Sequence, residues 1–131
     1  MHWTGAATTT VGSITYNSGS GLTVYATTSD YRSKDINGPV VDAVKTVSLL
    51  KPYMGKMKGA TIERPMFIAH ETQEIAPYAV RGEKDAVDEN GNAVFQQMDH
   101  STLVPLLTAA IQELKSELDS VKAELANLKG V

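Results

Sequence analysis

A serine and a lysine five residues apart are the groups in this sequence best suited to nucleophilic chemistry. Ser29 and Lys34 lie in the stretch TTSDYRSKD, residues 27–35, with Asp30 and Arg32 between them. A serine hydroxyl is a weak nucleophile at neutral pH and needs a base, usually a histidine and sometimes a desolvated lysine. The alternative is an ordinary polar loop, because Ser29 and Asp30 are also residue types that cap turns.

The position of Ser29 indicates which bond it would attack. Residues 1–28 contain no lysine, arginine, aspartate or glutamate, and the charged part of the chain begins after Thr28. A serine that attacks the carbonyl directly before itself closes a five-membered ring and forms an ester, which water can hydrolyse. The sequence therefore allows self-cleavage between Thr28 and Ser29, a reaction that needs no substrate pocket.

Composition argues against several other classes of function. The chain has 131 residues, a net charge of −3 and no cysteine. It has no basic excess for nucleic acid or an anionic membrane surface, and no thiolate for catalysis, disulfides or zinc. Its start lacks the pattern of a signal peptide, and no apolar run approaches the ~20 residues of a membrane span. We expect neither a nucleic-acid partner nor a membrane partner.

Alternating apolar and polar residues predict β-structure in the first 28 residues. Residues 13–17 alternate, residues 22–26 alternate again, and the turn-forming NSGSG of residues 17–21 connects them. A hairpin this thin does not fold alone. It must therefore pair with other copies or with a preceding segment.

Short elements are predicted in the middle of the chain. Five apolar residues at helical spacing predict a helix over residues 40–50, which the following KPY ends. A strand around residues 62–68 and a short helix that ends near Pro77 follow. In ENGN, residues 89–92, the Asn-Gly pair accepts φ > 0 at both central positions and predicts a hairpin.

A heptad repeat occupies the C-terminal end of the chain. Apolar residues recur at steps that alternate between three and four. The core positions are Val104, Leu107, Ile111, Leu114, Leu118, Val121, Leu125 and Leu128. Glu117 and Glu124 fall at g and lysines fall at e, the arrangement that pairs charges between parallel chains.

This repeat has two interpretations. A helix that packs on its own domain usually shows a broader apolar stripe, so the strict repeat favours self-association. Leucine at two a positions, Leu118 and Leu125, disfavours a dimer and favours a trimer. We predict parallel helices over residues 103–129, about 40 Å long, capped near Ser101 or Asp99 with Pro105 in the first turn.

Four blocks of the chain resemble one known family in their order. They are SDYRSKDI, PVVDAVKTVSLLKPY, MFIAHETQEIAPYAV and DHSTLVPLLTAAIQELKSEL. Together they are similar to the C-terminal intramolecular chaperone domain of bacteriophage tail spikes and tail fibres, which also occurs in endosialidases and in the myelin regulatory factor. The resemblance covers residues 29 to about 128. Met66 and His70 depart from the family pattern, outside the S-D-x-R-x-K motif.

The resemblance implies a Ser–Lys dyad that cuts the chain immediately before the serine. Carried over by position, Ser29 is the nucleophile, Lys34 is the general base, and Thr28–Ser29 is the bond that breaks. Asp30 and Arg32 match motif positions and are expected to position the dyad.

The resemblance also implies a purpose for the cleavage. Such a domain trimerises, aligns the preceding fibre shaft and then releases itself. Residues 1–28 would be the shaft tip, destined for the virion tail, and residues 29–131 the chaperone and peptidase domain, acting in the host cytoplasm during assembly. The expected fold is a homotrimeric α+β fold with a β-rich tip, a mixed middle whose hairpin forms an arm, and a parallel coiled coil.

The sequence allows two alternative functions, and two of its patterns resemble metal sites only weakly. The chain would otherwise be a trimerisation module with an inert Ser29, or a receptor-binding fibre tip that stays attached. His70, Glu71 and Glu74 lack the second histidine of a zinc-protease helix. Residues 88–92 lack the spacing of a calcium loop. We therefore predict neither a metal nor a cofactor.

Overall fold

The structure, a computed structural model, describes residues 1–4 and 10–130 and has the mixed α+β composition expected. The chain divides into two compact units, Met1–Gly38 and Pro39–Val131. Ser29 and Lys34 belong to the first unit, together with the predicted shaft tip. The predicted cleavage bond therefore lies inside a compact unit.

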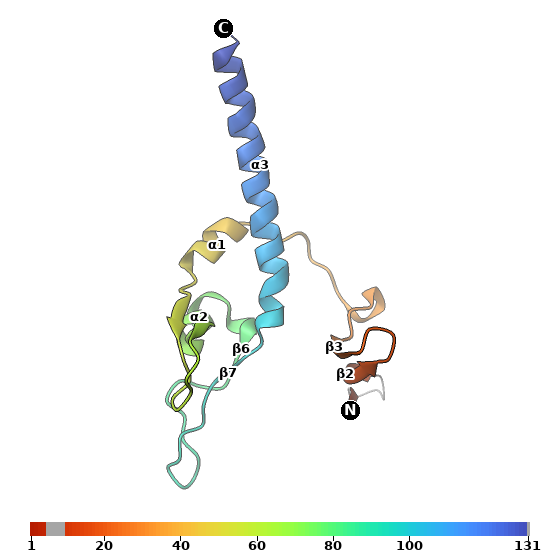
Figure 1. The fold of residues 1–131 in the computed structure, drawn as a ribbon, viewed down its shortest axis with the longest axis vertical. Coiled ribbons are helices and arrows are strands. Elements are labelled where there is room, and N and C mark those ends of the chain that lie inside the picture. Colours follow the sequence, from red (N-terminus) through yellow and green to blue (C-terminus); the bar gives the residue numbers. More distant parts are fainter. Residues whose placement is uncertain (5–9, 131) are drawn as a thin grey trace. The chain divides into compact units, whose positions relative to one another are not determined.

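A small antiparallel sheet forms most of the first unit, with strand order β1-β2-β3 (Figure 1). Its strands are β1 (His2–Thr4), β2 (Thr10–Asn17) and β3 (Leu22–Thr27). The Asn17 side chain accepts hydrogen bonds from two backbone N–H groups of the turn. Gly21 has a φ of 70°, a conformation that glycine adopts without strain. The predicted hairpin is confirmed, and β1 is an additional strand.

The register of the hairpin places apolar side chains on both faces of the sheet. Ile14 lies opposite Tyr25, whereas Val24 lies opposite Thr15. Because side chains alternate along a strand, these two pairs face opposite sides. One face carries Ile14, Tyr16 and Tyr25, and the other carries Leu22, Val24 and Ala26. Tyr25 is 77% exposed and Leu22 is 64% exposed, so neither face is buried within one chain.

The described residues of the second unit form three helices, short turns of 3-10 helix and two small sheets (Figure 1). The helices are α1 (Ala43–Leu49), α2 (Ala69–Ile75) and α3 (Val104–Lys129). The 3-10 turns in this unit are η2 (Pro77–Ala79) and η3 (His100–Leu103). β4 (Tyr53–Gly55) pairs with β5 (Arg64–Met66), and β6 (Val80–Arg81) pairs with β7 (Gln97–Met98).

Helix boundaries agree with prediction except at the start of α1. Val40 and Val41 precede α1, because Asp42 has a φ of 53° and the helix begins only at Ala43. The Asp99 carboxylate accepts a hydrogen bond from the Ser101 N–H, so η3 is capped where predicted and leads directly into α3.

The ENGN turn differs from the predicted type. Val87 and Ala93 form a bridge, as a hairpin requires. Gly91 has a φ of 80°, but Asn90 is not among the residues of positive φ. The Gly91 N–H donates to the Asp88 carbonyl, so the loop is a longer one with a single left-handed glycine. The expectation of φ > 0 at both central residues was therefore wrong.

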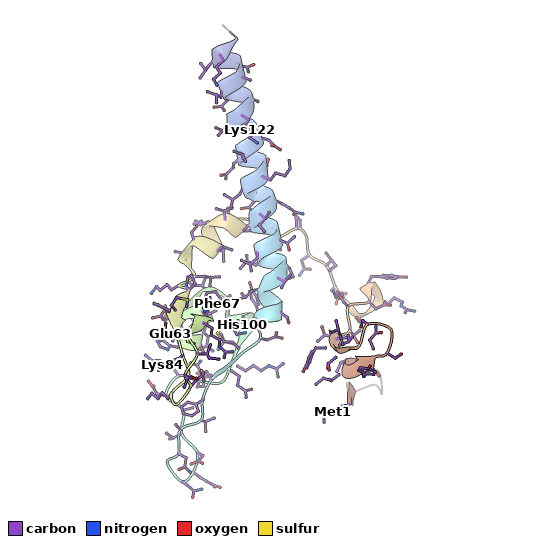
Figure 2. All side chains as sticks on the ribbon, in the orientation of Figure 1. Met1, Glu63, Phe67, Lys84, His100 and Lys122 are labelled. Atoms are coloured by element: carbon purple, nitrogen blue, oxygen red, sulfur yellow. The ribbon has the colours of Figure 1, made fainter. Side chains whose placement is uncertain are left out.

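The core of the second unit is small. Its buried apolar residues are Ala43, Ala76, Ala79, Val80, Leu103, Leu106 and Ala110. Phe67 stacks on His100 beside this core, with ring centroids 6.3 Å apart (Figure 2). None of the larger side chains in the described residues is fully buried. One chain therefore shields little apolar surface.

Candidate Ser–Lys active site

A turn of 3-10 helix, η1 (Tyr31–Ser33), connects the candidate nucleophile to the candidate base. Asp30 caps this turn, because its carboxylate accepts a hydrogen bond from the Arg32 N–H at 2.9 Å. The Ser33 hydroxyl donates to the Asp30 carbonyl at 2.8 Å, and the Lys34 N–H donates to the Tyr31 carbonyl. The turn reverses the direction of the chain and brings the Lys34 side chain next to Ser29.

Ser29 and Lys34 are in direct contact. The Lys34 Nζ lies 2.6 Å from the Ser29 Oγ, within hydrogen-bond distance. As an ammonium, Lys34 donates to the hydroxyl oxygen. As a neutral amine, it would accept the hydroxyl proton along the same line, which is the geometry a general base requires.

Asp30 and Arg32 form a two-pronged ion pair. Arg32 donates from Nε to one Asp30 oxygen and from a terminal nitrogen to the other, both at 2.8 Å. These side-chain hydrogen bonds, with the one from the Arg32 N–H, hold the pKa of Asp30 below its usual value. The Arg32 side chain is 76% exposed, so the pair contributes chiefly by fixing the shape of the turn.

Thr28, which supplies the carbonyl of the candidate bond, directly follows β3. Its N–H donates to the Val11 carbonyl at 2.9 Å, and its hydroxyl donates to the Thr10 carbonyl at 2.5 Å. Among the described residues, no N–H or O–H group donates to the Thr28 carbonyl oxygen. The carbonyl is therefore not engaged by the sheet that anchors its residue.

Both members of the pair are exposed in the single chain. A lysine becomes a base at neutral pH most readily when it is removed from solvent, because burial disfavours its charged form. A hollow of about 650 Å³ is lined by residues of the second unit and includes neither Ser29 nor Lys34. The single chain thus brings the Ser29 hydroxyl and the Lys34 amine into contact but leaves the amine exposed to solvent.

The predicted coiled-coil positions form an uncovered stripe on α3. All eight are exposed, from 41% at Leu107 to 75% at Leu128. The exposed fraction lies between these two limits for Ile111, Leu114, Leu118, Val121 and Leu125. A different face of α3, with Leu106 and Ala110, packs on the small core. The helix therefore meets its own domain without using the heptad stripe.

Glu113 fixes α3 against α1. Its two carboxylate oxygens accept hydrogen bonds from the N–H groups of Ala43 and Val44, both at 2.8 Å. These are free N–H groups at the start of α1, where a carboxylate is favourable. Both hydrogen bonds hold the pKa of Glu113 below its usual value.

Comparison with protein-family models finds no match for this chain, and comparison with curated proteins finds none either. In the part of the chain that the structure describes, no group of three or more His, Asp or Glu side chains could hold a metal ion. No helix of that part is long and apolar enough to cross a membrane.

The sequence motif predicted four residues of the candidate site, and other residues that contribute to it were missed. Ser29, Lys34, Asp30 and Arg32 were named from the motif, and the structure places them in one turn. Ser33 was missed, although its hydroxyl donates to the Asp30 carbonyl and helps to close the turn. The contacts of Thr28 and Glu113 leave no local signal, because their partners lie far away in the sequence.

Proposed function

We propose that the chain is a trimerising intramolecular chaperone that releases itself by cutting its own Thr28–Ser29 bond. The observation that carries this proposal is the 2.6 Å contact between the Lys34 Nζ and the Ser29 Oγ. The contact occurs immediately after a residue whose carbonyl accepts no hydrogen bond from the described residues. The resemblance to the chaperone domains of phage tail spikes and fibres agrees with this proposal.

The reaction proceeds in two stages. The neutral Lys34 amine takes the Ser29 hydroxyl proton as the Oγ attacks the Thr28 carbonyl carbon. The C–N bond then breaks, the Ser29 nitrogen takes a proton from the Lys34 ammonium, and an ester joins Thr28 to the Ser29 Oγ. Water, deprotonated by the Lys34 amine, hydrolyses the ester. The products are a carboxylate at Thr28 and a free amine at Ser29.

Exposed apolar surface supports the trimeric part of the proposal. The chain exposes 10972 Å², whereas a compact monomer of 14.1 kDa exposes roughly 6,700 Å². Even two separate globular units of these sizes would expose roughly 8,000 Å². The heptad stripe of α3 and both faces of the β2–β3 hairpin belong to this excess. Partner copies that meet these surfaces would bury them.

A parallel three-helix coil over residues 103–129 fits the uncovered stripe. In the alternative, the heptad stripe of α3 would pack on its own domain. This is disfavoured, because α3 contacts that domain through Leu106, Ala110 and Glu113 instead. In this arrangement the coil holds three chain ends at one level. The ordering of three shaft tips then costs less loop-closure entropy.

One observation favours a second candidate function, a trimerisation module that is not cut. Ser29 and Lys34 are both exposed in the single chain, so the residues that the structure describes do not remove the lysine from solvent. In our proposal, neighbouring copies provide this desolvation when the trimer forms.

The intact mass of the purified chain, followed over time, distinguishes the two functions. We expect the unmutated chain to give two fragments that meet between Thr28 and Ser29, and Ser29→Ala to stay whole because it lacks the attacking oxygen. Sequencing of the new amino terminus provides the check on position. An uncut wild-type trimer, or a terminus at any residue other than Ser29, would reject self-cleavage.

A further inference from the structure

Two donors of Thr28 attach it to consecutive carbonyls of strand β2. Its N–H bonds to the Val11 carbonyl at 2.9 Å, and its hydroxyl bonds to the Thr10 carbonyl at 2.5 Å. The first bond extends the β2–β3 ladder by one step beyond the end of β3 at Thr27. The second is a side-chain bond that an ordinary strand residue does not make.

The two sides of the candidate bond are therefore held by different structures. The sheet holds Thr28 on the acyl side, while the Lys34 contact and the Asp30 turn hold Ser29 on the amine side. Attack requires the Oγ to approach the carbonyl carbon at a defined distance and angle, and small misplacements cost large factors in rate. A bond that holds the Thr28 side chain as well as its N–H fixes the frame of the Thr28 Cα, and with it the direction in which the bond to the scissile carbonyl carbon leaves the strand.

We propose that Thr28 is a positioning residue, whose hydroxyl anchors the scissile carbonyl to β2 in the orientation that Ser29 attacks. This inference rests on the proposed self-cleavage and adds a requirement to it. The residue before the nucleophile must carry a hydroxyl on its β-carbon, so threonine and serine are accepted and other residues are poorly cut.

The anchor also makes cleavage depend on the folding of the segment that is released. Both acceptors are backbone carbonyls of β2, at Thr10 and Val11. They reach Thr28 only when β2 has paired with β3 as far as its last residue, Thr27. A chain whose tip has not formed this hairpin would hold its scissile bond in no fixed orientation, and would stay uncut.

The test compares Thr28→Val with Thr28→Ser in the full chain. Valine keeps the shape of threonine and has a high strand preference, but it has no hydroxyl; serine keeps the hydroxyl and has a lower strand preference. A merely structural role for Thr28 predicts that valine is tolerated better than serine. The positioning role predicts the opposite order, and this reversal is the diagnostic readout.

We expect Thr28→Val to slow the first-order cleavage rate by roughly ten- to a hundredfold, with Thr28→Ser restoring most of the rate. The matched control is Thr27→Val, since the Thr27 hydroxyl makes no hydrogen bond with a described residue. Valine at 28 cutting as fast as threonine, or faster than serine, would overturn the inference and leave self-cleavage intact. Cleavage in Ser29→Ala, run beside these variants, would instead overturn both.

Discussion

At the scale of residues, the site consists of a pair of reactive groups and a turn that brings them together. Among the described residues, no third side chain is hydrogen-bonded to the Lys34 amine, so the candidate base has no orienting partner there apart from the serine itself. The Asp30–Arg32 pair fixes the turn instead, with three hydrogen bonds between these two residues. The geometry around Lys34 therefore depends on the backbone shape of the turn.

Replacing Lys34 distinguishes between two roles for this residue, a general base and a salt-bridge partner. Lys34→Arg keeps the positive charge, but a guanidinium does not lose its proton in the accessible pH range. We expect it to cut as slowly as Lys34→Ala, with both slowed by roughly a hundredfold or more. The measurement is the rate of appearance of the residue-29 fragment by mass spectrometry. Cleavage at full rate in Lys34→Arg would show that charge alone is needed.

The cleavage rate should rise with pH. An ammonium must lose its proton before it can accept the Ser29 proton, so alkaline conditions increase the reactive form. Hydrogen bonds from Arg32 hold the pKa of Asp30 below its usual value, so the turn stays ionised across the neutral and alkaline range. The rise therefore reports on Lys34 and not on loss of the turn. A rate that is flat or falls between neutral and alkaline pH would contradict the assignment.

At the scale of elements, a long-range cap joins α1 to α3. Asp42, the residue before α1, makes no side-chain cap, and the Glu113 carboxylate supplies it from α3 instead. The folded pKa of Glu113 lies below its unfolded value because both hydrogen bonds favour the charged form. The cap is therefore present above the unfolded pKa, about 4.3, and is lost as the pH falls through the lower folded value.

Glu113→Gln should lower the melting temperature at neutral pH by roughly a few degrees. The difference from wild type should vanish in acid, where the wild-type carboxylate is also protonated. Asp119→Asn is the matched control, because Asp119 pairs with Lys115 of its own helix and both side chains are exposed. Thermal unfolding in a Ser29→Ala background, at one protein concentration, provides the measurement. An equal loss from both changes would argue against a specific cap.

Periodicity predicted the elements that carry a long or regular pattern and missed those that depend on distant contacts. The heptad repeat predicted α3, and alternation predicted the strands β2 and β3. The late start of α1 was missed, because the periodicity of Val40 and Val41 does not reveal the left-handed conformation of Asp42. The ENGN turn was assigned the wrong type, because Asn-Gly fits several loops and the flanking hydrogen bonds decide among them.

At the scale of the whole molecule, exposed apolar surface lies in both compact units. The first unit exposes Tyr16 and Tyr25, and the second exposes the heptad stripe that includes Leu118. A soluble monomer rarely leaves an apolar stripe as long as the one on α3 in water. In the proposed function, assembly would bury apolar surface of the tip and of the coil.

Leu118→Asp should abolish the trimer and the cleavage. It would place three like charges in one dry layer of the coil, and burying unpaired charge costs several kcal/mol. Ala123→Asp adds the same charge at a position on the opposite side of the heptad and should leave the trimer intact. Sedimentation gives the oligomeric state, and mass spectrometry of the same samples gives the cleavage. Full-rate cutting by a Leu118→Asp monomer would separate assembly from catalysis.

The bidentate cap from Glu113 also determines how α3 is rotated about its own axis. A helix that is not held can rotate about its axis, and its apolar stripe would then face a partner helix only by chance. The two carboxylate oxygens of Glu113 accept hydrogen bonds from the N–H groups of Ala43 and Val44. These bonds fix the rotation of α3 about its axis before any partner binds. In the proposed trimer, partner helices would then have one rotational degree of freedom fewer to search. An apparently local cap would thus act on the rate of assembly, by preorganising each monomer for its seam.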